Sequence, residues 1–323
     1  MQFLALATIA ATLCTASGKN ILLTNDDGWA ATNIRALHRD LTAAGHNVVT
    51  IAPAVQMSGN GARFGIPAAT TLKTPALFNY PPAGSPSWGH EEDDYNMWYF
   101  DGTPAACVAA GLDYVIPNYF SNMTIDLVLA GPNEGNNLGE RDFVLSGTVG
   151  AVNYGIQRGY PAIALSGANS NNSFFKDNLN DNPNDAPNIY SKKSVELVNQ
   201  LFESQGENPR VLPLSTGLNV NLAVAGEDLD SDCIDLQFKQ TRLTGPNAKV
   251  YKIGYNETSN MILGYLPGEY DPVKYCAAGD CSLPDEFSVV KTCAIAITAF
   301  SLDSDVDADT DAKIFSRLSN IVS

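Results

Sequence analysis

The stretch that decides the fold is residues 20–28, NILLTNDDG. Its apolar run stops after Thr24 at a polar turn with two adjacent aspartates, and apolar residues then recur at helical spacing over residues 34–41. This pattern predicts a buried strand, a polar turn and an amphipathic helix that packs back on the strand.

The same alternation continues along the chain. Further strands are predicted at residues 47–52, 125–130, 161–165 and 219–225, and helices at residues 104–115, from Ser146 onward and at 191–202. Strands that alternate with helices indicate an α/β fold, a Rossmann-like three-layer sandwich. Beyond residue 231, the runs at 249–255 and 294–300 are predicted to form hairpins appended to the sheet, followed by a short C-terminal helix. Residues 167–188, rich in Asn, Asp and Pro, are expected to form an exposed loop.

Residues 1–17 are expected to be a signal peptide. A short apolar run is followed by the small residues Thr15, Ala16 and Ser17, and the run is too short to span a bilayer of about 30 Å. Residues 18–323 are then a single domain, with a core at 19–225 and a C-terminal extension at 226–323. We therefore expect a secreted protein. Sequons at Asn122, Asn171 and Asn256 agree with glycosylation, although each is weak evidence alone.

The charge of the chain excludes some functions. Its 323 residues include 19 Lys and Arg against 35 Asp and Glu, a net charge of −16, while 45% are hydrophobic. A surface with this charge repels nucleic-acid polymers and anionic membranes, so neither is an expected partner.

The cysteines fit an oxidising compartment. The five that follow the leader are most economically two disulfides and one free thiol. Cys276 and Cys281 can close a short loop, and Cys233 with Cys293 is the remaining pair if Cys107 is buried. Spacing alone leaves other pairings open.

Polar side chains follow three of the predicted strands. Asp26 and Asp27 follow the first, Ser58 the second and Asn133 the third along the chain. The carboxyl ends of parallel strands form the usual ligand-binding edge of such a sheet. Adjacent carboxylates repel each other unless a cation lies between them, and an all-oxygen donor set suits Mg²⁺ or Mn²⁺ and disfavours zinc.

A candidate anion site accompanies this cation site. Ser146, Gly147 and Thr148 open a predicted helix, whose free N–H groups suit a phosphate. Cation and anion sites in one cleft indicate phosphate chemistry. Each of these candidate site residues also has a purely structural interpretation. The aspartates and Ser146 can be helix caps, and Ser58-Gly59 can be a turn.

Two other patterns are set aside. Residues 59–65 imitate a dinucleotide-binding loop, but the third glycine is displaced and no helix can begin at Gly65-Ile66-Pro67. The alternating aspartates at 303–311 lack the glycine and the final glutamate of a calcium loop, which favours an acidic helix start.

The motifs of residues 19–167 resemble the SurE family of survival phosphatases and nucleotidases. In chain order they are residues 21–28 (ILLTNDDG), Ala52-Pro53 with Ser58-Gly59, Gly102-Thr103-Pro104 with Cys107-Val108, residues 131–139 (GPNEGNNLG) and Ser146-Gly147-Thr148-Val149. A fainter likeness covers residues 285–298.

The resemblance implies a metal-dependent phosphomonoesterase with a Rossmann-like fold and with C-terminal elements exchanged in dimers. One divalent cation, Mg²⁺ or Mn²⁺, is then bound by Asp26, Asp27, Ser58 and Asn133. The phosphate-contacting positions are Asn137, Ser146, Gly147 and Thr148.

The sequence departs from the family pattern at two places. Residues 31–34 are ATNI where the family usually has APGI, and Glu134 replaces what is commonly a small residue. Glu134 places another carboxylate near the ion, and both changes bear on substrate preference.

We therefore expect a secreted hydrolase of small phosphate monoesters, nucleotides included, that acts as an acid phosphatase, a 5′/3′-nucleotidase or both. The cation activates a water molecule and Asp26 moves its proton. The alternative is a non-catalytic secreted binding protein of the same fold. Trp29 or Trp98 could stack on a nucleobase, although Trp98 also fits the core.

Overall fold

The computed structural model describes residues 18–121, 123–251, 253–263, 270–273, 276, 279–318 and 321. The expected leader at 1–17 and the sequon residue Asn122 lie outside the described residues.

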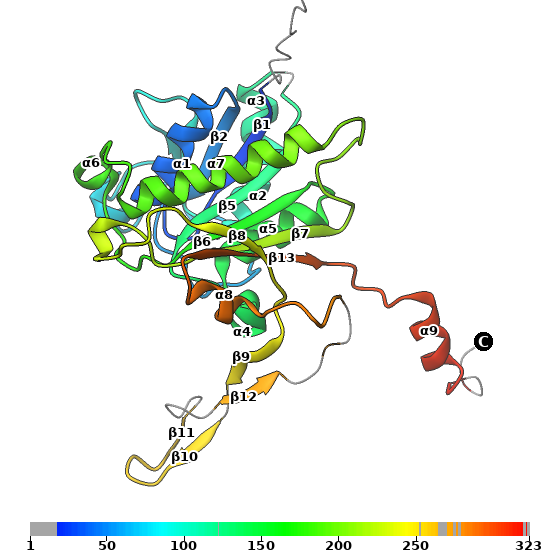
Figure 1. Ribbon diagram of the computed structural model, residues 1–323. Coiled ribbons are helices and arrows are strands. Elements are labelled where there is room, and N and C mark those ends of the chain that lie inside the picture. The colour runs from blue at the N-terminus through cyan, green and yellow to red at the C-terminus, as the bar shows by residue number, and fades with distance from the viewer. Residues whose placement is uncertain are drawn as a thin grey trace, which may run out of the picture.

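The central element is a nine-stranded sheet with the order β3-β4-β2-β1-β5-β6-β7-β13-β8 (Figure 1). Strands β4, β2, β1, β5, β6 and β7 run parallel to one another, whereas β3, β13 and β8 run the opposite way. The strands are β1 (Asn20–Thr24), β2 (Asn47–Pro53), β3 (Trp88–His90), β4 (Met97–Phe100), β5 (Leu127–Glu134), β6 (Ala162–Gly167), β7 (Thr216–Leu222), β8 (Gln237–Gln240) and β13 (Ala294–Ser301).

Helices cover both faces of this sheet. The larger helices are α1 (Thr32–Ala43), α2 (Pro104–Ala110), α5 (Gly147–Gln157) and α7 (Ala186–Ser204), and the shorter ones are α3 (Ile116–Tyr119), α4 (Gly139–Leu145), α6 (Phe175–Asn178), α8 (Glu286–Val290) and α9 (Ala308–Phe315). Alternate residues of β1 point to opposite layers: Leu23 packs with α1 and α7, and Leu22 packs with α2 and α5. The three-layer α/β sandwich is thus confirmed.

The C-terminal region enters the sheet more deeply than expected. The prediction that residues 294–300 form an appended hairpin is wrong, because β13 inserts between β7 and β8 and pairs antiparallel with β7. Appended hairpins do occur, in the part of the chain between β8 and β13. They are β9 (Gly245–Tyr251) with β12 (Tyr270–Val273) and β10 (Gly254–Asn256) with β11 (Met261–Leu263). Helix α9 lies apart from the sheet (Figure 1), and Asp307 caps it, as an acidic helix start predicts.

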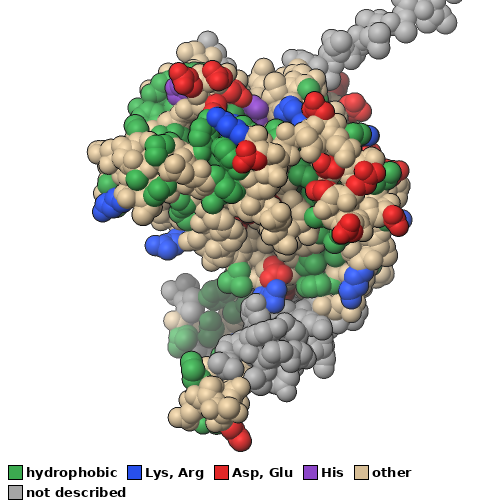
Figure 2. All heavy atoms as spheres, turned by 90° about the vertical axis from the view of Figure 1, so that its left-hand side faces the viewer, with side chains coloured by type: hydrophobic (Ala, Val, Ile, Leu, Met, Phe, Trp, Pro, Cys, Tyr) green, Lys and Arg blue, Asp and Glu red, His purple; other side chains and the backbone are tan. Residues whose placement is uncertain are grey.

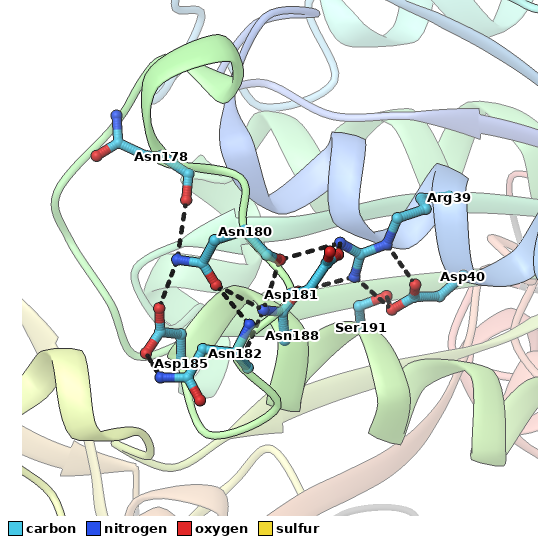
Figure 3. A network of polar contacts seen from close by, with 9 residues as sticks. All are labelled: Arg39, Asp40, Asn178, Asn180, Asp181, Asn182, Asp185, Asn188 and Ser191. Carbon is cyan, nitrogen blue, oxygen red and sulfur yellow. Dashed lines mark hydrogen bonds and ion pairs between the residues drawn. The ribbon is translucent and has the colours of Figure 1, made fainter.

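The Asn-rich segment at 167–188 is only partly exposed: it contains the short helix α6 and the start of α7, and it is organised by its own side chains (Figure 3). Asn180 and Asn182 each donate to the carboxylate of Asp185 at 2.7 Å, just before α7 begins. Asn188 donates to the Asn182 carbonyl at 2.7 Å and accepts from Arg39 of α1 at 2.7 Å. Polar contacts therefore attach this segment to both helices of one layer.

The two disulfides and one free thiol expected from the sequence are present, with the pairing considered for them. Cys233 is bonded to Cys293 and Cys276 to Cys281, and Cys107 is a free thiol buried in the core. Acidic side chains are spread over the face of the molecule in Figure 2, and Lys and Arg side chains stand singly among them. None of the helices in the described residues is long and apolar enough to cross a membrane.

Candidate functional site

The turn after β1 presents two aspartates at the carboxyl edge of the sheet. Asn25 closes this turn: its side-chain oxygen accepts from the Gly28 N–H at 3.2 Å and its amide donates to the Gly28 carbonyl at 3.0 Å. Gly28 has a φ of 109°, which a side chain would strain. The turn therefore holds Asp26 and Asp27 in a fixed position, each only 1% exposed.

Asp26 lies against the N-terminus of α5. Its carboxylate accepts the hydroxyl of Thr148, and the backbone N–H groups of Gly147 and Thr148 face it. A Cβ on Gly147 would lie 2.9 Å from the Asp26 carboxylate, so only glycine allows this approach. Burial raises the pKa of Asp26, and the hydrogen bonds from α5 oppose that rise. The structure thus brings three of the predicted site residues into contact.

Asp27 is a second buried carboxylate in an unfavourable electrostatic environment. Its Oδ2 accepts the backbone N–H of Glu134 at 2.8 Å. Burial raises its pKa well above the usual value, and the negative charges of Asp26 and Glu134 raise it further. Such a carboxylate is stabilised by a bound cation.

Asn133 offers a free acceptor beside these carboxylates. Its side chain is 7% exposed, its Nδ2 donates to the Gly135 carbonyl at 2.6 Å, and its Oδ1 is buried without a hydrogen-bond partner. Within the described residues no three Asp, Glu, His or Cys side chains converge into a metal site of their own. Amide oxygen is therefore an essential part of any donor set here, and the residues fit a hard divalent cation.

Ser58 is near the aspartates but is differently engaged. The N–H of the preceding Met57 donates to the Asp26 carbonyl at 2.7 Å, which places the loop after β2 beside the turn. The Ser58 hydroxyl is exposed and accepts from Gln56 at 2.6 Å. For Ser58 to bind a cation as predicted, its hydroxyl must exchange the hydrogen bond from Gln56 for the cation.

The predicted phosphate positions divide into two groups. Gly147 and Thr148 contact Asp26, and Ser146 caps α5 by accepting the Val149 N–H at 3.2 Å, the plainer role considered for it. Asn137 has different partners, since its Nδ2 donates to the Ser166 hydroxyl at 2.8 Å.

A buried polar network that the sequence did not reveal holds the Asn137 loop. Asn219 and Asn221 of β7 donate to the Asn137 carbonyl at 3.0 and 3.1 Å. Glu286 of α8 accepts from Asn219 at 2.9 Å and from the Gly139 N–H at 2.8 Å. The two asparagines, spaced i and i+2 in an apolar strand, were the available signal, whereas nothing in the sequence marked Glu286.

The tryptophans are not available to stack on a base. Trp29 and Trp98 are each 2% exposed, and Trp29 lies flat against Tyr80 with ring centroids 5.0 Å apart. The prediction for Trp29 is therefore wrong, while the alternative of core burial is confirmed for Trp98.

The fold and the site together define a class: a Rossmann-like α/β protein with buried carboxylate and amide oxygens at the carboxyl edge of its sheet, beside a helix N-terminus. A family model described as survival protein SurE matches residues 21–252. The chain therefore belongs to the SurE family.

Two relatives and one solved structure are similar to this chain. An acid phosphatase of Yarrowia lipolytica is 42% identical over 90% of this chain and 81% of its own length. A 5′-nucleotidase SurE of Lawsonia intracellularis is 36% identical over 46% of this chain and half of its own length. The crystal structure of a SurE protein from Aquifex aeolicus has a TM-score of 0.58 at 23% identity, covers 93% of this chain and 99% of that one, and supports the fold.

Proposed function

We propose that the protein is a secreted, divalent-metal-dependent phosphomonoesterase that acts on small phosphate esters, nucleotides included. One observation carries the proposal: the buried Asp26 carboxylate meets the first turn of α5, and the buried Asp27 and Asn133 lie beside it at the ends of the paired strands β1 and β5. An oxygen cluster that favours a cation and a helix start that favours an anion are the two halves of a phosphate site.

Family membership makes the chain a hydrolase of phosphoric monoesters. The relatives' names support either an acid phosphatase or a 5′-nucleotidase. Support for secretion comes from the two disulfides and from Asn171, a sequon residue that is exposed.

Asp26, Asp27, Asn133 and Ser58 would bind the cation, Mg²⁺ or Mn²⁺. When bound, the cation supplies Lewis-acid polarisation of the phosphoryl group and activation of a water molecule. To orient the phosphoryl oxygens, the N–H groups of Gly147 and Thr148 must exchange their contact with the Asp26 carboxylate for one with the substrate. Oδ1 of Asp26 accepts a hydrogen bond from the Thr148 hydroxyl. Its other oxygen, Oδ2, takes the proton of the water molecule.

The experiment is a substrate panel of nucleotides and simple phosphate monoesters, assayed from pH 4 to pH 8 with Mg²⁺ or Mn²⁺ present. Hydrolysis of both kinds supports a broad acid phosphatase, and hydrolysis of nucleotides alone supports a dedicated nucleotidase. Phosphate binding without any turnover would contradict the proposal and favour the non-catalytic binding protein.

A further inference from the structure

Trp29 directly follows the aspartate turn, residues 25–28, and each of its polar groups is hydrogen-bonded. Its N–H donates to the Pro53 carbonyl at 2.9 Å, and its indole Nε1 donates to the Tyr80 carbonyl at 2.7 Å. Its own carbonyl accepts from Nε of Arg35 at 2.8 Å. Trp29 is thus fixed to β2, to α1 and to a residue between β2 and β3, and it fixes the end of the aspartate turn in the same way.

Arg35 holds Trp29 from a buried position in α1. Its guanidinium carbon lies 4.8 Å from the centroid of the Trp29 ring and 3.9 Å from that of Phe175. Its Nη1 lies 2.7 Å from Oε2 of Glu91, which directly follows β3. The Arg35 side chain is 7% exposed, and within the part of the chain that the structure describes its Nη2 has no hydrogen-bond partner.

Stability alone does not account for this buried ion pair. Removing two charges from water is costly, and replacement of such a pair by apolar side chains of similar volume often leaves stability unchanged or raises it. The unpartnered Nη2 of Arg35 adds to that cost. In contrast, the rigid fork of a guanidinium can bind the Trp29 carbonyl and the Glu91 carboxylate together, which a single ammonium group cannot reproduce. The arrangement therefore favours a role in geometry.

We propose that Arg35 is a positioning residue of the candidate site: it holds the Trp29 carbonyl and thereby the aspartate turn, while Glu91 holds its guanidinium. The inference rests on the proposed function, because it assumes that Asp26 and Asp27 bind a cation. Arg35 acts through Trp29 and needs no contact with the substrate. Residues that support metal ligands from behind typically change metal affinity or activity by about 10- to 100-fold when they are replaced.

Two variants separate positioning from stability. Arg35→Met/Glu91→Leu replaces the buried pair by apolar side chains, and Arg35→Lys keeps a charge beside Glu91 but loses the fork. The matched control is Arg158→Met/Asp113→Leu. It removes an exposed pair, 2.6 Å apart, at the C-terminal end of α5, whereas the candidate site lies at the N-terminus of that helix.

Both Arg35 variants should loosen the aspartate turn. In the metal-free full-length protein, hydrogen–deuterium exchange over residues 25–31 should be faster than in the wild type. Mn²⁺ affinity in isothermal titration and kcat for p-nitrophenyl phosphate should each fall by about tenfold. The urea midpoint of Arg35→Met/Glu91→Leu should differ from that of the wild type by no more than the control does, because apolar side chains replace both charges.

The outcomes separate the two proposals. If both Arg35 variants keep the wild-type Mn²⁺ affinity and kcat, with or without faster exchange, the positioning role is refuted and the proposed function stands. If the wild-type protein neither binds Mn²⁺ nor hydrolyses phosphate esters, the proposed function is refuted, and faster exchange over residues 25–31 would still support the hold of Arg35 on the turn. Arg35→Lys keeps the test decisive if Arg35→Met/Glu91→Leu does not fold.

Discussion

Two regions of the sheet are stabilised by different means. At the carboxyl ends of β1 and β5, Asp26 and Asp27 are buried and held by backbone N–H groups, a hydroxyl and amide side chains. In the region after β7, the chain is held by the Cys233–Cys293 and Cys276–Cys281 disulfides, and α9 has no buried residue. The first region contains buried carboxylates whose charges are electrostatically unfavourable. The second region is stabilised by covalent links.

The two regions meet at Glu286. This residue belongs to the C-terminal region, yet its carboxylate accepts from Gly139 and Asn219 and so supports the loop that carries Asn137. The contrast thus predicts that changes in the first region remove activity, changes at the disulfides remove stability, and Glu286 couples stability to pH.

The largest effect is expected at Asp26. Asp26→Asn should lower kcat/KM for p-nitrophenyl phosphate by about 10³-fold, because it removes a proton acceptor and cation ligand. Thermal unfolding should show an intact fold, since the variant also removes a buried charge beside Asp27. Asp232→Asn, at an exposed position, is the control. Near-normal activity in Asp26→Asn would refute the assignment of the site.

The second-largest effect is expected at the disulfide that closes the longer loop of chain. Cys233 and Cys293 are 60 residues apart in sequence, and loop-closure entropy assigns such a link about 4 kcal/mol. The Cys233→Ser/Cys293→Ser double variant should lose about that much free energy of unfolding in urea, while the folded fraction keeps its kcat. A loss of activity larger than the loss of folded protein would show that the two regions are not separable.

Glu286 should make stability depend on pH. Burial raises its pKa from 4.5 to about 7. Its stabilising contribution is therefore complete below about pH 4.5 and is lost as the pH rises through about 7, by up to roughly 3 kcal/mol. Unfolding free energies of the metal-free protein should fall over this window, and Glu286→Gln should remove that part of the fall. Identical slopes in both proteins would contradict this coupling.

The smallest effect is expected at the shorter disulfide. Cys276 and Cys281 are 5 residues apart, so the same entropy argument gives about 2 kcal/mol. Cys276→Ser/Cys281→Ser should thus shift the urea midpoint by about half as much as the Cys233 and Cys293 variant. A shift larger than that of the longer link would mean that strain or local contacts outweigh chain entropy.

The sequence predicted the parts of the molecule that local patterns specify. Strands β1, β2, β5 and β6 were recognisable because parallel strands covered on both faces are continuous apolar runs, whereas β3 and β4 were not predicted. Asp26, Asp27 and Asn133 could be placed together because the carboxyl ends of such strands lie at one edge.

The remainder depends on contacts between distant segments. The insertion of β13 between β7 and β8 is a pairing choice that no local pattern encodes. Trp29 is buried because Tyr80, 51 residues away in the chain, stacks on one side of it and Arg35 lies 4.8 Å from its ring. Asn172 reaches Asp27 across 145 residues of chain.

We propose that a divalent cation at Asp26, Asp27 and Asn133 drives hydrolysis of phosphate monoesters. The direct measurement is phosphate release from p-nitrophenyl phosphate by purified protein after exhaustive dialysis against EDTA, before and after addition of Mg²⁺ or Mn²⁺. We predict a rate near background in the metal-free protein, restoration by the added cation, and no restoration in Asp26→Asn. A full rate in the presence of EDTA, or full restoration in Asp26→Asn, would contradict the claim.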